Sequence, residues 1–155
     1  MTAVRNILIA GLVLACGAAA GCLGPRQTRR DIYLNLMTPL QEADYRLLEA
    51  QLKPVSLRLA YLQEIGAYQT WSQQPKDMQD AILRRQAREG MSPIQVQMAW
   101  GPPERETETT DAADRAAGHR RVVWDYGFRP GGSDGAYERS VCFYDDEALW
   151  IRDAR

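Results

Sequence analysis

The stretch Gly90-Met91-Ser92-Pro93-Ile94-Gln95-Val96-Gln97-Met98-Ala99-Trp100-Gly101-Pro102-Pro103 carries signals for both ends of a short helix. Ser92 is a good N-cap, because its hydroxyl can accept a backbone N–H that otherwise has no partner. Pro93 suits the first helical position, and Gln95 completes a capping-box pattern. Gly101 permits the left-handed backbone that ends a helix, and the prolines after it cannot continue one. The stretch therefore predicts a helix of about two turns.

A helix this short is marginal in water unless it packs on something else. Val96 and Trp100 lie one turn apart on the same face, and Ile94 and Met98 form a second apolar pair. The segment that follows has the alternating pattern of antiparallel strands. We therefore expect the helix to bury Val96 and Trp100 against a sheet.

The same residues resemble the signature of the BamE (SmpA/OmlA) family of outer-membrane lipoproteins, in which Gly-Met-Thr is followed by Gln-Val and by Leu-Gly-x-Pro. The matching positions are Gly90, Met91, Ser92, Val96, Trp100, Gly101 and Pro103. Ser92 stands in place of Thr, and Trp100 in place of Leu. The resemblance covers the chain from about Arg88 to Asp153. It implies a fold of two helices and a small sheet, which β-lactamase-inhibitor-like domains share.

The N-terminus resembles a lipoprotein export signal. Arg5 supplies a positive start, residues 7–20 are apolar or small, and Cys22 follows small residues as in a bacterial lipobox. The apolar run is too short for a spanning helix. We expect cleavage before Cys22, acyl chains such as palmitate on it, and, because Leu23 is not Asp, sorting to the periplasmic face of the outer membrane. Cleavage before Cys16 and a plain secretory signal remain open alternatives.

Composition argues against two classes of protein. Once Cys22 is acylated and the leader is removed, Cys142 has no partner, so no disulfide framework is expected. The net charge of the whole chain is −1, and it becomes −2 when Arg5 leaves with the leader. A chain with so little net charge is not expected to bind nucleic acid.

Two amphipathic helices are expected after the N-terminal tether. Thr38-Pro39-Leu40-Gln41 repeats the capping pattern and predicts a helix to about Leu52, and a second helix runs from about Val55 to Trp71. The turn at Lys53-Pro54 makes them a helical hairpin. The residues expected to face inward are Leu40, Ala43, Leu47 and Ala50 on the first helix, and Leu57, Tyr61, Ile65, Tyr68 and Trp71 on the second.

A third helix and a set of strands complete the expected elements. The helix runs over about 76–88, with Met78, Ala81 and Ile82 inward and Arg84, Arg85 and Arg88 near its end. Strands are expected over 104–110, 120–128, 137–144 and 148–152, with Leu149 and Ile151 on one face and Trp150 on the other. Residues 111–119 are expected to form a loop.

No residue pattern points to catalysis, a cofactor or a metal. The single histidine, His119, is in a loop with no nucleophile motif beside it. Cys142 alternates with apolar residues and is expected to be a structural thiol. Asp145-Asp146-Glu147 are adjacent, so their carboxylates cannot converge on Ca²⁺ as alternate positions do.

We therefore expect an α+β protein in which an N-terminal helical hairpin and two further helices pack on a three- to four-stranded antiparallel sheet. The expected segments are a lipoprotein signal peptide (1–21), a lipidated tether (22–37), the helical hairpin (38–72) and a BamE-like helix–helix–sheet domain (73–155). The expected core residues are Tyr61, Tyr68, Trp71, Val96, Trp100, Trp124, Tyr126 and Phe143.

Three functional hypotheses follow. The resemblance implies a lipid-anchored, non-catalytic scaffold in outer-membrane protein assembly or envelope maintenance. The hairpin has no counterpart in the family core, which favours a lineage-specific envelope partner. The second hypothesis is an inhibitor or binding module similar to β-lactamase-inhibitor domains, which resemble two copies of this unit. The third, an enzyme, has no residues to support it.

Overall fold

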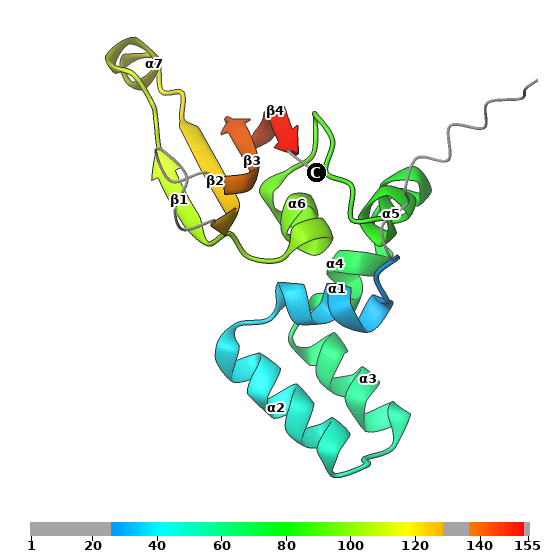
Figure 1. The fold of residues 1–155 in the computed structure, drawn as a ribbon. Coiled ribbons are helices and arrows are strands. Elements are labelled where there is room, and N and C mark those ends of the chain that lie inside the picture. Colours follow the sequence, from blue (N-terminus) through cyan, green and yellow to red (C-terminus); the bar gives the residue numbers. More distant parts are fainter. Residues whose placement is uncertain (1–25, 129–136, 154–155) are drawn as a thin grey trace, which may run out of the picture.

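The computed structural model describes residues 26–128 and 137–153, which form an α+β fold (Figure 1). The sheet is antiparallel and four-stranded, with the order β1-β2-β3-β4, so the α+β class expected from the sequence is confirmed. The helices are α1 (Arg29–Leu36), α2 (Pro39–Ala50), α3 (Val55–Glu64), α4 (Ala67–Ser72), α5 (Lys76–Leu83), α6 (Pro93–Trp100) and α7 (Ala112–Ala116). The strands are β1 (Arg105–Glu108), β2 (Arg121–Phe128), β3 (Tyr137–Tyr144) and β4 (Glu147–Asp153).

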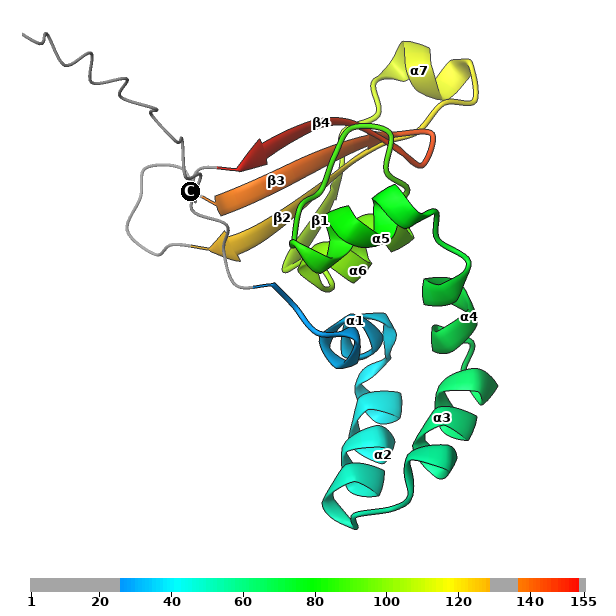
Figure 2. The same ribbon diagram turned by 90° about the vertical axis from the view of Figure 1, so that its right-hand side faces the viewer.

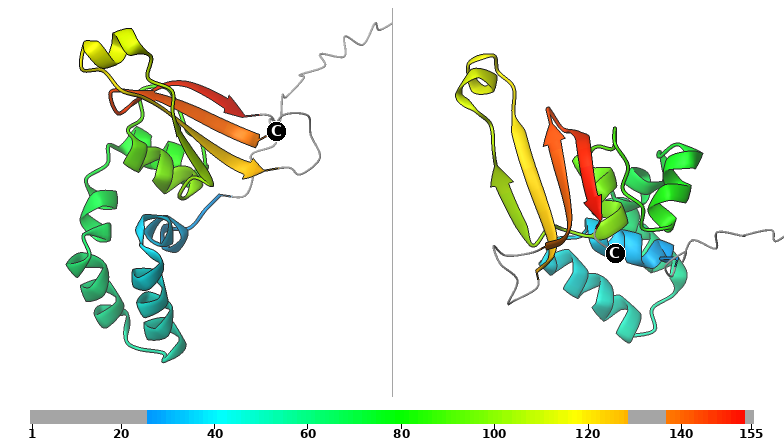
Figure 3. Two further views of the ribbon diagram at one scale, coloured as in Figure 1. Left: turned by 90° about the vertical axis from the view of Figure 1, so that its left-hand side faces the viewer. Right: turned by 45° about the horizontal axis from the view of Figure 1, so that its top comes forward.

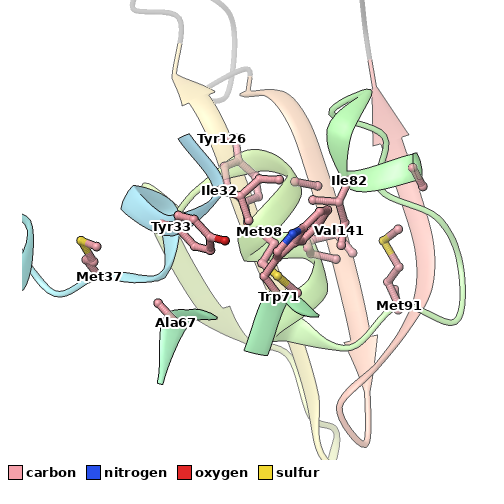
Figure 4. Packing of buried hydrophobic residues seen from close by; sticks show 14 of the residues in the cluster. Ile32, Tyr33, Met37, Ala67, Trp71, Ile82, Met91, Met98, Tyr126 and Val141 are labelled. Carbon is pink, nitrogen blue, oxygen red and sulfur yellow. The ribbon is translucent and has the colours of Figure 1, made fainter. Parts of the chain in front are cut away.

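The core lies between one face of the sheet and the helices. α6 lies against this face, and α1 and α5 pack on α6 (Figures 1 and 2). Side chains from four helices and two strands meet there, namely Ile32, Trp71, Ile82, Met98, Tyr126 and Val141 (Figure 4). Every buried apolar residue of the described ranges lies between Ile32 and Ala148.

Most of the expected core residues contribute to this cluster. Trp71, Val96, Tyr126 and Phe143 are buried, and Tyr61, Trp100 and Trp124 are half-buried against them. Tyr68 is exposed, so its expected place in the core is wrong. The reason is the break at Gly66 before it, which turns the next helix relative to α3.

Helix caps predicted from the sequence are present in the structure. At α6 the Gln95 side chain accepts the backbone N–H of Ser92 at 2.9 Å, and Gly101 ends the helix with a φ of 90°. At α2 the side chains of Thr38 and Gln41 each accept the other residue's backbone N–H. These caps depend on residues three apart, which is why sequence alone located them.

α1 differs from the expected tether, because its residues belong to the folded domain. Thr28 and Asp31 form a capping box at its start, and Ile32 is fully buried with Tyr33 beside it. Met37, the last residue assigned to the tether, is also buried. The apolar side chains of α1 pack on α6 and α4, so this segment cannot act as a solvated spacer.

α2 and α3 form the predicted hairpin, which projects from the rest of the molecule (Figures 1 and 2). The single helix expected to reach Trp71 is divided, since Gly66 takes a φ of 77° between α3 and α4. α5 likewise ends at Leu83, earlier than expected, and Arg85 just beyond it has a φ of 56°. Both breaks let the chain turn back toward the sheet.

The four strands agree with the alternation read from the sequence, except in β4. The β3–β4 turn at Asp145 and Asp146 has φ values of 48° and 65°, as a tight hairpin requires. A register shift at the middle of β3 places Leu149 as an extra residue in β4. Leu149 is therefore exposed while Ile151 packs against the core, so the prediction that both share one face is wrong. Figure 3 shows the sheet from two further directions.

Candidate interaction surface

Gly90 and Met91, at the start of the 90–103 stretch, attach the segment before α6 to the edge of the sheet. The Gly90 N–H donates to the Ala148 carbonyl at 2.8 Å, and the Ala148 N–H donates to the Met91 carbonyl at 2.8 Å. Met91 is fully buried. These two hydrogen bonds hold the segment against β4, the edge strand of the sheet.

The rest of the stretch fixes α6 to its neighbours. Val96 is fully buried, and the Trp100 indole N–H donates to the Arg85 carbonyl at 2.9 Å. A Cβ on Gly101 would lie 3.4 Å from Oδ1 of Asn35, so α6 and α1 approach closely there. Pro103 is half-buried where the chain enters β1. Ser92 and these residues act in packing and capping.

The predicted lipid-attachment residue, Cys22, lies outside the described residues, as does Cys16. Within the described ranges, no helix has both the length and the apolar composition needed to cross a bilayer. Anchoring through Cys22 therefore remains a prediction from the sequence.

His119 forms a surface pair with the β3–β4 turn. Its Nδ1 lies 2.6 Å from Oδ2 of Asp145, whose other oxygen accepts the Arg120 N–H at 2.8 Å. The Arg120 N–H and then the His119 ring hold the pKa of the Asp145 carboxyl below its usual range. The imidazole packs 5.2 Å from the Tyr144 ring. None of these contacts supplies a nucleophile. The pair links the segment after α7 to the β3–β4 turn.

Cys142 is buried on β3, and burial raises the pKa of its thiol. Such a thiol is a poor nucleophile at neutral pH. Among the described residues, no three His, Cys, Asp or Glu side chains are grouped as metal ligands would be. The Asp145–Glu147 turn forms no such group either.

Sequence reasoning missed a polar row across the face of the sheet opposite α6. Arg105, Asp125, Ser140 and Arg152 lie directly opposite one another, one on each strand. Arg105 donates to Asp125 at 2.8 Å, Ser140 donates to Asp125 at 2.6 Å, and Arg152 donates to Ser140 at 2.9 Å. Asp125 is only 4 % exposed. The sequence signal for this row was an aspartate, Asp125, in the middle of an otherwise apolar strand. The neighbouring polar groups of the row compensate the buried charge of Asp125.

A pocket of about 330 Å³ lies between the segment at Glu89 and Gly90 and the β3–β4 hairpin. Its lining is Glu89, Gly90, Tyr144, Glu147, Ala148 and Leu149. The charged groups on its wall are the carboxylates of Glu89 and Glu147.

The largest departure from the sequence expectation is an exposed apolar stripe on α2. Leu40, Ala43, Leu47 and Ala50, expected to face inward, are all exposed, with Leu40 73 % and Leu47 56 % accessible. Tyr45, on the opposite side of the helix, is buried instead and stacks on Tyr61 of α3 with ring centroids 6.4 Å apart. The expected inward stripe is therefore wrong. We call Leu40, Ala43, Leu47 and Ala50 the α2 stripe.

The tip and outer surface of the hairpin are also apolar. Leu52, in the turn after α2, has a φ of 51° and is 90 % exposed. Val55, Leu57 and Leu59 on α3 are exposed as well, so the expectation that Leu57 faces inward is wrong. A left-handed backbone is unusual for a leucine, so the turn holds this side chain outward at a conformational cost. Contiguous exposed apolar groups on a soluble surface mark interaction sites.

Comparison of the chain with models of known families, with curated proteins and with solved structures finds no match. Its function must therefore be inferred from its own surfaces and sequence signals.

Proposed function

We propose that this protein is a lipid-anchored lipoprotein of the cell envelope that acts as a non-catalytic protein-interaction scaffold. Outer-membrane protein assembly or envelope maintenance is the process that its resemblance to the BamE family suggests. The observation that carries the proposal is the projecting hairpin with the exposed α2 stripe. A scaffold needs such a surface, whereas an enzyme needs converging reactive groups.

The α2 stripe has the spacing of a helix-packing seam. Leu40 and Leu47 are seven residues apart, as are Ala43 and Ala50, and the two pairs are offset by three. This is the a/d pattern by which one helix packs on another. The alternation of large and small side chains leaves room for a partner's apolar side chains between the leucines. A helix or helical groove of another envelope protein is the partner chemistry that fits.

The hairpin is built to display this seam. Its inner side is held by the Tyr45–Tyr61 stack and by the Tyr61 hydroxyl, which donates to the Gln41 carbonyl at 3.1 Å. The end of α2 beside the hairpin turn is held by the bidentate pair between Arg30 of α1 and Glu49, with N–O distances of 2.8 and 2.7 Å. The α2 stripe takes no part in these contacts, so a partner can cover it without unfolding the hairpin.

Affinity capture from detergent-solubilised membranes tests the scaffold. The full chain should retain an envelope protein, and the double variant Leu40→Gln/Leu47→Gln should lose it while keeping the same helical content. Leu149→Gln is the matched control, because it changes an equally exposed leucine on β4. Outer-membrane assembly proteins captured by the wild type but not by the double variant would support the proposal. Recovery of a soluble hydrolase would overturn it in favour of an inhibitor module.

Anchoring is tested separately by mass spectrometry of the N-terminal peptide. The mature chain should begin at an acylated Cys22, and Cys22→Ser should abolish acylation while Cys16→Ser leaves it unchanged. Several acyl chains on one residue give stable membrane attachment, because each buried CH₂ contributes about 0.8 kcal/mol. An unmodified N-terminal peptide from a soluble protein would refute the lipoprotein assignment.

A further inference from the structure

Gln27, near the start of the described residues, is fixed at the end of α5. Its N–H donates to the Leu83 carbonyl at 2.9 Å, and its side-chain amide donates to the carbonyls of Ile82 at 2.6 Å and Met98 at 3.0 Å. Gln27 is only 4 % exposed. Gln27 therefore holds the start of the described chain at one place, beside the C-terminus of α5 and the start of α1, and we call this place the exit point.

Positive charge gathers around this exit point. Arg26 and Arg29 flank it on one side, and Arg84 and Arg85 follow the last residue of α5 on the other; all four are exposed. Arg85 is close enough to α1 to help lower the pKa of Asp31. We call Arg26, Arg29, Arg84 and Arg85 the basic rim.

Acidic groups near the rim do not neutralise it. Asp31 already accepts the N–H and hydroxyl of Thr28 at 2.8 Å each, and Asp80 forms a solvent-exposed pair with Arg26 at 3.6 Å. Among the described residues, Arg29, Arg84 and Arg85 have no ion pair. Three of the four guanidinium groups of the rim are therefore without an ion pair, and the fourth, on Arg26, has only a solvent-exposed one.

The chain between the rim and the proposed anchor is very short. Cys22 lies five residues before Gln27, and five extended residues span at most about 18 Å. The Debye length at physiological ionic strength is about 8 Å, so the rim is attracted to the surface only at distances well inside the reach of this segment. A domain attached this closely cannot turn freely, and its exit point must stay near the membrane.

We propose that the basic rim rests on the anionic headgroups of the membrane that holds the anchor. This inference rests on the proposed anchoring at Cys22. In both views α5 and the tip of the α2–α3 hairpin lie on opposite sides of α1 (Figures 1 and 2). The rim therefore faces the lipid while the hairpin is displayed away from it. The attraction depends on charge and not on the identity of one headgroup.

Vesicle co-sedimentation of the unacylated chain tests the rim separately from lipidation. The chain used is 23–155, which keeps every described residue and lacks the proposed acylation site. Vesicles of phosphatidylcholine alone are compared with vesicles that also contain phosphatidylglycerol or phosphatidylserine. The chain should bind both anionic vesicles alike, bind phosphatidylcholine weakly, and dissociate as salt is raised. Each arginine near an anionic surface contributes about 1 kcal/mol, which is about fivefold in affinity.

Arg84→Gln/Arg85→Gln should therefore weaken binding by roughly 25-fold, and Arg84→Lys/Arg85→Lys should retain it. Arg115→Gln/Arg120→Gln, which removes the same charge from exposed positions near α7, is the matched control and should bind as the wild type does. Equal binding to neutral and anionic vesicles, or an unchanged Arg84→Gln/Arg85→Gln variant, would overturn the proposal. Tighter binding to heparin than to any of the vesicles would also overturn the proposal, because it would indicate that the ligand of the rim is a soluble polyanion. Failure of these tests leaves the acylation result untouched, so the two proposals can fail separately.

Discussion

Replacement of Trp100 by alanine should destabilise the protein by about 3 kcal/mol. The indole N–H bond to the Arg85 carbonyl at 2.9 Å contributes about 1 kcal/mol. The edge-on contact with Tyr126, with centroids 5.3 Å apart, contributes about 1 kcal/mol. Arg139 above the ring at 5.0 Å adds about 0.5 kcal/mol at this half-buried site. Loss of apolar burial supplies the remainder.

Urea unfolding followed by far-UV circular dichroism measures this loss, since the other tryptophans complicate fluorescence. The slope of free energy against urea should stay constant, so that the midpoint alone shifts. Trp100→Phe keeps the ring contact but removes the N–H donor, and it should lose about 1 kcal/mol. Leu40→Ala, at a position 73 % exposed, should change stability by less than about 0.5 kcal/mol. A loss below about 1 kcal/mol for Trp100→Ala would refute the role assigned to this side chain.

Three further substitutions test other parts of the fold. Gly101→Ala should cost about 1–3 kcal/mol in urea unfolding, because a φ of 90° with a ψ of −177° is open only to glycine. Asp125→Ala should cost about 2–3 kcal/mol by the same assay, because it leaves Arg105 and Ser140 without their shared acceptor. The loss is smaller than for a fully buried ion pair, because the Arg105 side chain is partly solvated. The lowered pKa of Asp145 means that its stabilisation is present above the unfolded pKa near 3.8 and is lost as the pH falls through the folded value. The difference in melting temperature between wild type and Asp145→Asn should therefore be constant at neutral pH and shrink in acid, and a difference that persists in acid would contradict this assignment.

The elements that sequence predicted well are those defined by local chemistry. The caps at Ser92 and Thr38 and the glycine at 101 each act over a few residues, so their consequences do not depend on the fold. The strands were found for the same reason, because alternation reports one buried face directly. The capping box of α1, Thr28 with Asp31, was equally visible, but the expectation of a tether obscured it.

The failures concern which face of an element is buried, which depends on partners distant in sequence. α2 has apolar residues on one side and Tyr45 on the other, and periodicity favoured the larger number of apolar groups. The structure buries Tyr45 instead, because Tyr61 of α3 offers a matching ring. The bulge at Leu149 was not predicted for a related reason. One extra residue reverses which side chains of a strand face the core without changing the composition of the strand. The cross-strand row on Asp125 likewise requires the register of all four strands.

The position of α1 connects the two proposed surfaces. It begins at Arg29, two residues after Gln27, and it ends at Leu36, just before the cap of α2. Its Arg30 is paired with Glu49 near the far end of α2, and this contact lowers the pKa of the Glu49 carboxyl. Arg58 of α3 lies 3.9 Å from the same carboxylate, so one acidic group joins all three helices. The hairpin therefore cannot swing independently of α1, and α1 cannot move without disturbing Ile32 in the core. An anchor at one end of this helix would consequently set the direction in which the α2 stripe is displayed.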